Sequence, residues 1–199
     1  MKPSPVRTKS RSPFPFFLLL TKYELDGIDR FVELARETRK ERLERLAAET
    51  RRGAPDDDWL ADNLAQLDDF AVLSAEFAII GLWRCVELYR TSAIRIARTE
   101  AIRIASGGRA AARVKELSKL GIPRQRIPRC ARSVNELRCL NDAIKHARRV
   151  DGELAKLPRW RGKRGRELGN LESHYARLRS AAERYLNDLA DRLSRRTTI

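Results

Sequence analysis

The feature that most limits how this chain can fold is a long stretch, residues 59–104, over which one helix can run. Three acidic residues, Asp56 to Asp58, stand just before it, where the helix dipole favours negative charge. Residues 70–89 are apolar on nearly every side, which is typical of a helix at the centre of a bundle. A charge there, such as Glu76, is expected to sit in a structural ion pair.

The rest of the chain shows helical spacing and no strand pattern. Thr21 and Glu24 have the spacing of a capping box, and the helix that follows is expected to end at Gly53. A short helix is expected up to Leu120, and Asn170 is a good N-cap for a last helix. We therefore predict an all-α protein, an antiparallel bundle of about five helices.

The domain prediction separates a tail from one helical domain. Residues 1–20 are expected to be a flexible basic and apolar tail, and residues 21–199 a single domain. The apolar run Phe14–Leu20 is too short to span a bilayer and is expected to be extended and to dock on the body or on a partner. A weaker alternative has this tail holding the protein at an anionic membrane.

The charge favours a polyanionic partner. Lys and Arg number 42 against 27 Asp and Glu, for a formal net charge of +15. Such an excess favours RNA, DNA, an acidic protein or an anionic membrane. Two basic segments, residues 95–132 and 158–166, flank the helix expected over about 134–157.

That helix carries the candidate site. Ser133 and Glu136 have capping-box spacing, and an apolar stripe follows. The opposite face gathers polar side chains: Arg138, Asn141, Asp142, Lys145 and His146.

Those side chains could cleave RNA without a metal, because the ribose 2′-OH is then the nucleophile. His146 would be the general acid or base, Arg138 and Lys145 would hold phosphate, and Asn141 would position ribose or phosphate. Asp142 could orient the His146 ring, and Glu87 would brace the site from the neighbouring helix. Arg138 and His146 are about 12 Å apart along one helix, a separation that a dimer would shorten. The alternative is that His146 is an exposed surface residue.

The basic loop near residue 160 is expected to guide the RNA backbone. Trp160 either stacks on a base or anchors the loop in the core. The cations concerned are Arg159, Arg161, Lys163, Arg164 and Arg166.

No cofactor motif and no metal site is predicted. A zinc site would need Cys130, Cys139, His146 and His174, but no close cysteine pair starts one. Three cysteines without a disulfide pattern fit a cytoplasmic, reducing setting.

The run Asn135–His146 resembles the signature helix of HEPN (higher eukaryotes and prokaryotes nucleotide-binding) domains. Asn141 and His146 match the polar residue and histidine of that family's motif, whereas Leu140 stands where the family has arginine. The resemblance implies a small helical bundle, a homodimer in which two such motifs face each other, and metal-independent endoribonuclease activity. HEPN domains are common in bacterial toxin–antitoxin and defence systems, which implies a cognate antitoxin or partner protein.

The resulting expectation is a HEPN-like, RNA-binding protein that cleaves RNA in a bacterial defence or toxin–antitoxin system. The alternative is a non-catalytic basic module that binds nucleic acid or an acidic partner protein.

Overall fold

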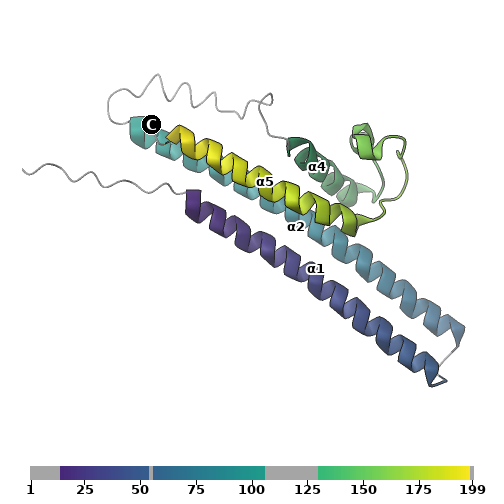
Figure 1. The fold of residues 1–199 in the computed structure, drawn as a ribbon. Helices are drawn as coiled ribbons and strands as arrows, with labels where there is room; N and C mark the ends of the chain where they lie inside the picture. The colour runs from purple at the N-terminus through teal and green to yellow at the C-terminus, as the bar shows by residue number, and fades with distance from the viewer. Residues whose placement is uncertain (1–13, 54–55, 106–129, 198–199) are drawn as a thin grey trace, which may run out of the picture.

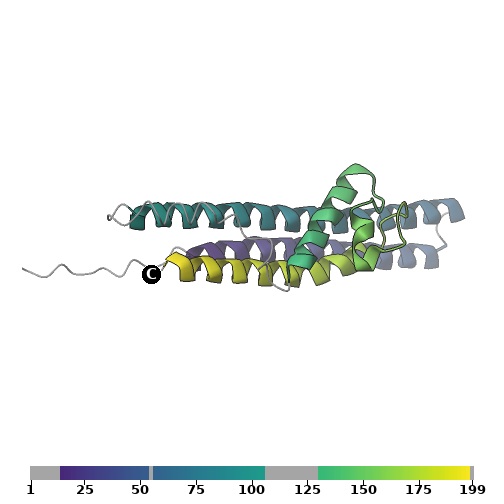
Figure 2. The same ribbon diagram turned by 90° about the horizontal axis from the view of Figure 1, so that it is seen from above.

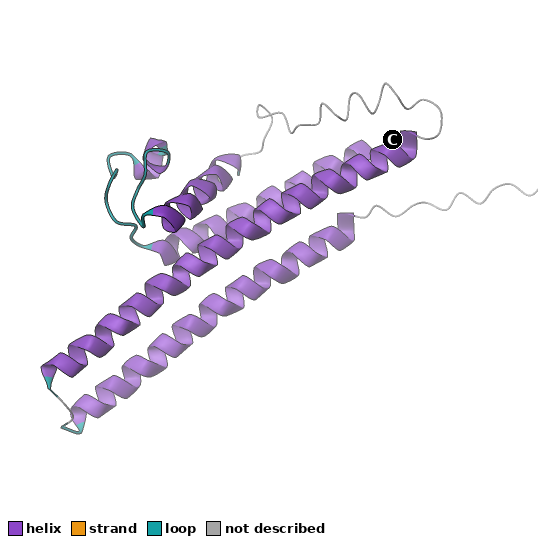
Figure 3. Ribbon diagram, turned by 180° about the vertical axis from the view of Figure 1, so that it is seen from behind, coloured by secondary structure: helices purple, strands orange, loops and turns teal. Residues whose placement is uncertain are grey.

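A computed structural model describes residues 14–53, 56–105 and 130–197, and most of these residues are helical, with no β-strand among them (Figure 3). They form four α-helices: α1 (Phe14–Arg51), α2 (Asp57–Ala105), α4 (Ala131–His146) and α5 (Leu171–Thr197). Two 3-10 turns, η2 (Leu154–Lys156) and η3 (Pro158–Trp160), lie between α4 and α5. The all-α prediction is confirmed, whereas the short helix expected before Leu120 lies outside the described residues.

Two long helices set the shape of the molecule. α1 and α2 have 38 and 49 residues and form an antiparallel hairpin (Figure 1). At 1.5 Å per residue α2 is about 74 Å long. α5 lies along both, and α4 with the two turns packs on α2 and α5, away from α1 (Figures 1 and 2). No described helix has the length and apolarity needed to cross a membrane.

The core is built where α2 meets the other helices. Ile79, Leu82 and Val86 of α2 are fully buried, as are Leu137 and Leu140 of α4. The apolar seam of α5 closes the bundle of the one chain. Every residue of that seam is buried: Leu171, Tyr175, Leu178, Ala182, Tyr185 and Leu189.

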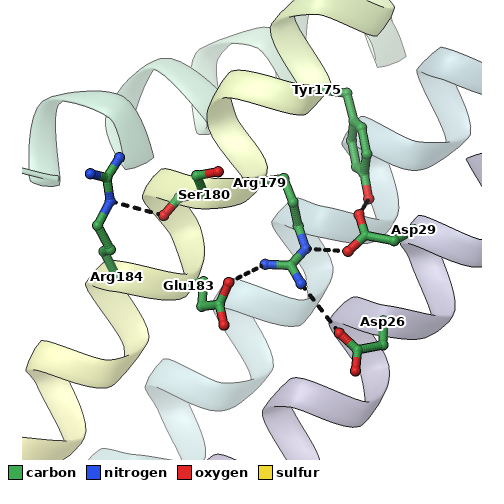
Figure 4. Close-up of polar contacts among 7 residues, drawn as sticks. All are labelled: Asp26, Asp29, Tyr175, Arg179, Ser180, Glu183 and Arg184. Atoms are coloured by element: carbon green, nitrogen blue, oxygen red, sulfur yellow. Dashed lines mark hydrogen bonds and ion pairs between the residues drawn. The ribbon is translucent and has the colours of Figure 1, made fainter.

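A polar cluster fixes α5 against α1 (Figure 4). Arg179 donates from Nε to Asp29 Oδ2 at 2.9 Å and from Nη1 to Glu183 Oε2 at 2.8 Å, and it pairs with Asp26 at 3.5 Å. The Tyr175 hydroxyl donates to the other Asp29 oxygen at 2.7 Å. Burial, followed by this hydrogen bond, raises the pKa of Tyr175. Because these groups come from both helices, they set the register of α5 on α1.

Three expectations about helix ends and burial are wrong. α1 begins at Phe14 rather than Thr21, so the apolar run is the first part of a helix rather than an extended segment. α4 ends at His146 rather than near residue 157, because the backbone turns at Ala147 and Arg148 adopts a left-handed φ of 53°. The middle of α2 is not buried all round, since Phe77 is 62% exposed.

The expected capping box on α4 does not form. Cys130 is the N-cap residue and makes no side-chain capping bond, so Ser133 lies inside the first turn. Glu136 bonds instead to residues outside the helix. The ion pair expected for Glu76 is confirmed, because its Oε2 accepts from Arg148 Nη2 at 2.6 Å.

Candidate nucleic-acid interface

A cleft of about 1040 Å³ opens between α2, the first half of α4, η3 and α5. Its walls include Trp83 from α2, Ala131 and Ser133 from α4, and Tyr185 from α5. Six arginines from all four elements line it: Arg90, Arg132, Arg138, Arg159, Arg177 and Arg184. Glu136 is the one acidic residue among its described lining residues, so the cleft carries a strong positive charge.

Glu136 holds the walls of the cleft together. Its side chain is buried, and its two oxygens accept from Arg177 at 3.1 and 2.6 Å. The indole Nε1 of Trp160 donates to Oε1 at 2.9 Å. One carboxylate of α4 therefore joins α5 to the η3 turn.

Trp160 is a loop anchor. Its ring is 2% exposed and stacks on His174 with 4.6 Å between ring centroids. Burial, followed by the nearby Arg177 guanidinium, lowers the pKa of His174, which favours the neutral ring in this stack. Of the two roles open for Trp160, the geometry favours anchoring the loop over stacking on a base.

Most of the arginines are free to meet an anion. Arg177 is paired with Glu136, and Arg138 donates from Nη1 to Asp142 Oδ2 at 3.0 Å. The remaining four are exposed and have no carboxylate partner in the described part of the chain: Arg90, Arg132, Arg159 and Arg184. The uncapped N-terminus of α4 faces the same cleft, where its dipole adds positive potential.

A second hollow continues the cleft along α2. It has a volume of about 610 Å³ and is lined by Glu87, Thr91, Ile94 and Arg95. Trp83 and Arg90 line both hollows, so the two adjoin at these side chains. An aromatic ring and several cationic groups thus line one surface track.

The expected catalytic group does not assemble within one chain. Arg138 lines the cleft, whereas Lys145 and His146 are exposed at the far end of α4 and do not line it. Asn141 is only 1% exposed and donates to Asp142 Oδ1 at 3.1 Å, so it cannot reach a substrate.

The expected partners of His146 are engaged elsewhere or distant. Asp142 accepts from Arg138 and Asn141 rather than orienting the imidazole. Glu87 lies in the second hollow on α2 and touches neither Arg138 nor His146 through any hydrogen bond or ion pair. In the described structure His146 itself makes no hydrogen bond or ion pair.

The loop cations divide in the same way. Arg159 lines the cleft, whereas four others are exposed on the loop beyond it: Arg161, Lys163, Arg164 and Arg166. Sequence reasoning missed Trp83, Arg90, Arg177 and Arg184, whereas Arg132 belongs to the basic segment 95–132 that it singled out. Arg177 and Arg184 are seven residues apart beside the seam of α5, which puts them on one face and was the available signal.

Metal binding finds no support in the described side chains. No group of three or more His, Cys, Asp and Glu among them is placed to hold an ion. Burial raises the pKa of the Cys85 thiol to about 12 and also raises that of Cys139, which disfavours the thiolate forms that bind metals.

Comparisons with protein-family models, with curated proteins and with solved structures found no match to this chain. The function of the protein is therefore inferred from the cleft and from the residues that line it.

Proposed function

We propose that the protein binds RNA in the arginine cleft and acts as a binding module rather than as a nuclease. The observation that carries this proposal is the convergence of four arginines, from α2, α4, η3 and α5, on one hollow, none of them paired with a described carboxylate. Guanidinium groups bind phosphate oxygens in a bidentate manner, and the counterions released from RNA drive the association. The formal charge of +15 adds long-range attraction.

Single-stranded RNA fits the track better than a duplex. Trp83 lies where the two hollows adjoin, with Arg90 beside it and Arg95 further along α2. A flat aromatic side chain between cations is the usual arrangement for stacking an unpaired base while the backbone is neutralised. The bases of a duplex are already stacked and cannot use such a ring.

Cleavage is left out of the proposal because the histidine and the arginines are apart. His146 is exposed at the C-terminal end of α4, while the cleft opens at its N-terminal end. A HEPN-like ribonuclease would need a second chain to bring a cleft arginine to His146, because Arg148 and Arg149, which follow it in sequence, do not line the cleft. The alternative in which the basic helical surface only binds its partner needs no such step.

The direct test measures binding of a fluorescent single-stranded RNA by anisotropy over a range of salt concentrations. Reversing two cleft charges, Arg132→Glu with Arg159→Glu, should weaken binding by about tenfold to a thousandfold and flatten the salt slope. The matched control is Arg52→Glu with Arg51→Glu, two exposed cations at the tip of the α1–α2 hairpin. Equal losses in both pairs would show that net charge, and not the cleft, binds RNA.

A second experiment tests whether the bound RNA stays intact. Incubation in EDTA should leave its length unchanged, because the proposal assigns no catalytic group. Cleavage that His146→Ala abolishes would overturn the binding-only proposal and favour the nuclease.

A further inference from the structure

The outer face of the α1–α2 hairpin carries an apolar groove that no described helix covers. The groove has a volume of about 680 Å³ and lies on the side of the hairpin away from the cleft-lining face of α2. Its lining includes Gly27, Ile28 and Phe31 of α1 and Phe77, Gly81 and Leu88 of α2. None of the residues that line this groove also lines the arginine cleft.

Large apolar side chains continue along both rims of the groove. On α1 they are Leu20, Tyr23, Phe31 and Leu34, each at least 42% exposed, and Gly27 of the groove stands midway between Tyr23 and Phe31. On α2 they are Phe70, Leu73, Phe77 and Leu88, each at least 39% exposed, and Gly81 and Arg84 of the groove stand between Phe77 and Leu88. Such spacing is that of a helix-packing seam, and a contiguous exposed seam of this kind marks an interaction surface.

The register of the hairpin pairs residues across the groove. It is fixed by the Arg39–Asp68 ion pair and by the approach of Ile28 to Gly81. In this register Leu20 stands level with Leu88, and Phe31 level with Phe77. The charged side chains of the groove, Glu24 and Arg84, stand level with each other between them.

We propose that two copies of the chain pair through this groove, about a twofold axis that runs parallel to α1 and α2. Such an axis keeps each residue at its own level and places α1 of one copy opposite α2 of the other. Phe31 then meets Phe77 of the partner subunit, and Glu24 meets Arg84 of the partner subunit. Both contacts occur twice, so the surface complements itself in shape and in charge.

Glycines at the middle of the groove allow the two hairpins to approach. Gly27 has no atom within 4 Å of a Cβ built on it, and Gly81 lies at the same level on α2. Because neither glycine has a side chain, the facing backbones of two hairpins can come close at this level. The product is a four-helix arrangement in which every neighbouring pair is antiparallel.

The amino-acid composition of residues 1–13 and 106–129 does not suit either segment to fill the apolar groove. Residues 1–13 contain three prolines and four cations, with Val6 as the one large aliphatic residue after Met1. Residues 106–129 carry seven Lys and Arg and one acid. Neither offers the aromatic residues that an apolar groove with phenylalanine rims would match. A second copy does.

The test is the mass of the full-length protein, measured by light scattering after size exclusion. The wild type should give 2 × 22.9 = 45.8 kDa, twice the mass of one chain. Glu24→Arg and Arg84→Glu should each place like charges in the contact and shift the protein towards 22.9 kDa. The double variant Glu24→Arg/Arg84→Glu restores opposite charges and should restore the dimer.

The double variant separates pairing from folding. Tyr89 also faces Glu24, so a single reversal could disturb the monomer, but that disturbance would persist in the double variant. Wild-type protein of monomer mass at all micromolar concentrations would overturn the proposal and indicate that another segment or another protein covers the groove. A double variant that stays monomeric while its circular dichroism is unchanged would overturn it too.

Discussion

The two sides of α2 show how differently one helix can be used. Towards α4 and α5 it presents Trp83 and Arg90 to a cleft whose described lining has six arginines and one acid. Towards the outside of the hairpin it presents Phe77, Arg84 and Leu88 to a groove whose described lining has one arginine and one acid. The positive charge is thus concentrated on one side, and the exposed apolar surface on the other. A phosphate-bearing ligand and an apolar protein surface would therefore use different faces.

The largest effect that separates the two faces should come from Glu136→Ala. This change leaves the buried Trp160 Nε1 and the Arg177 guanidinium without their shared acceptor. Each unsatisfied group costs about 1–3 kcal/mol, so the free energy of unfolding should fall by about 2–6 kcal/mol in urea denaturation. The cleft should be lost with it, while the groove should stay intact.

The matched control for Glu136→Ala is Glu153→Ala. Glu153 is paired with Lys156, but both side chains are more than 60% exposed, so the loss should be about 0–1 kcal/mol. If the two variants were equally destabilised, Glu136 would not be the residue that holds the cleft walls together.

Two substitutions on opposite sides of α2 test whether the cleft and the groove act independently. Trp83→Ala should weaken single-stranded RNA binding by about 1–3 kcal/mol, roughly 5- to 150-fold, and leave the dimer mass unchanged. Phe77→Ala should lower the dimer mass at low concentration and leave RNA affinity unchanged. Anisotropy and light scattering on both variants check this, and a duplex RNA should respond little to Trp83→Ala. Equal effects of the two changes on either measurement would mean that the faces are not independent.

Sequence periodicity located the helices because local spacing encodes them. The bounds of α2 follow to within two residues from the acidic residues before it and from its helical spacing, and α5 begins directly after Asn170 as expected. Asn170 itself has a left-handed φ of 53° rather than the conformation of an N-cap. The end of α4 did not follow, because Val150 and Leu154 continue the apolar spacing of the stripe. Both are buried from a folded loop instead, which the backbone bonds of Val150 with Arg166 and Gly165 close at 2.9 Å.

The cleft could not be predicted because its parts are far apart in sequence. Arg90, Arg132, Arg159 and Arg184 come from four elements, and only tertiary packing brings them together. Likewise, the apolar residues of 70–89 predicted a fully buried helix, because a sequence pattern does not show which neighbours cover each face. The same pattern results whether other helices cover every face of α2 or leave one face open as a groove. A single sequence therefore locates the helices but not the surfaces formed between them.

The smallest expected effect is a pH dependence that tells the two histidines apart. The folded pKa of His174 lies below 6.5 because of burial and then Arg177, so below pH 6.5 the unfolded chain binds more protons than the folded one. Stability should therefore fall as the pH drops through 6.5 towards the lower folded pKa. His174→Gln should remove part of that fall in urea denaturation at pH 7 and pH 5. The control variant is His146→Gln, whose side chain is exposed and makes no hydrogen bond or ion pair in the described structure. If the two variants gave the same slope, the Trp160–His174 stack would not be the pH-sensitive element of the cleft wall. Helical spacing placed His146 on a polar face, but only packing could show that His174 is a ring held by its surroundings.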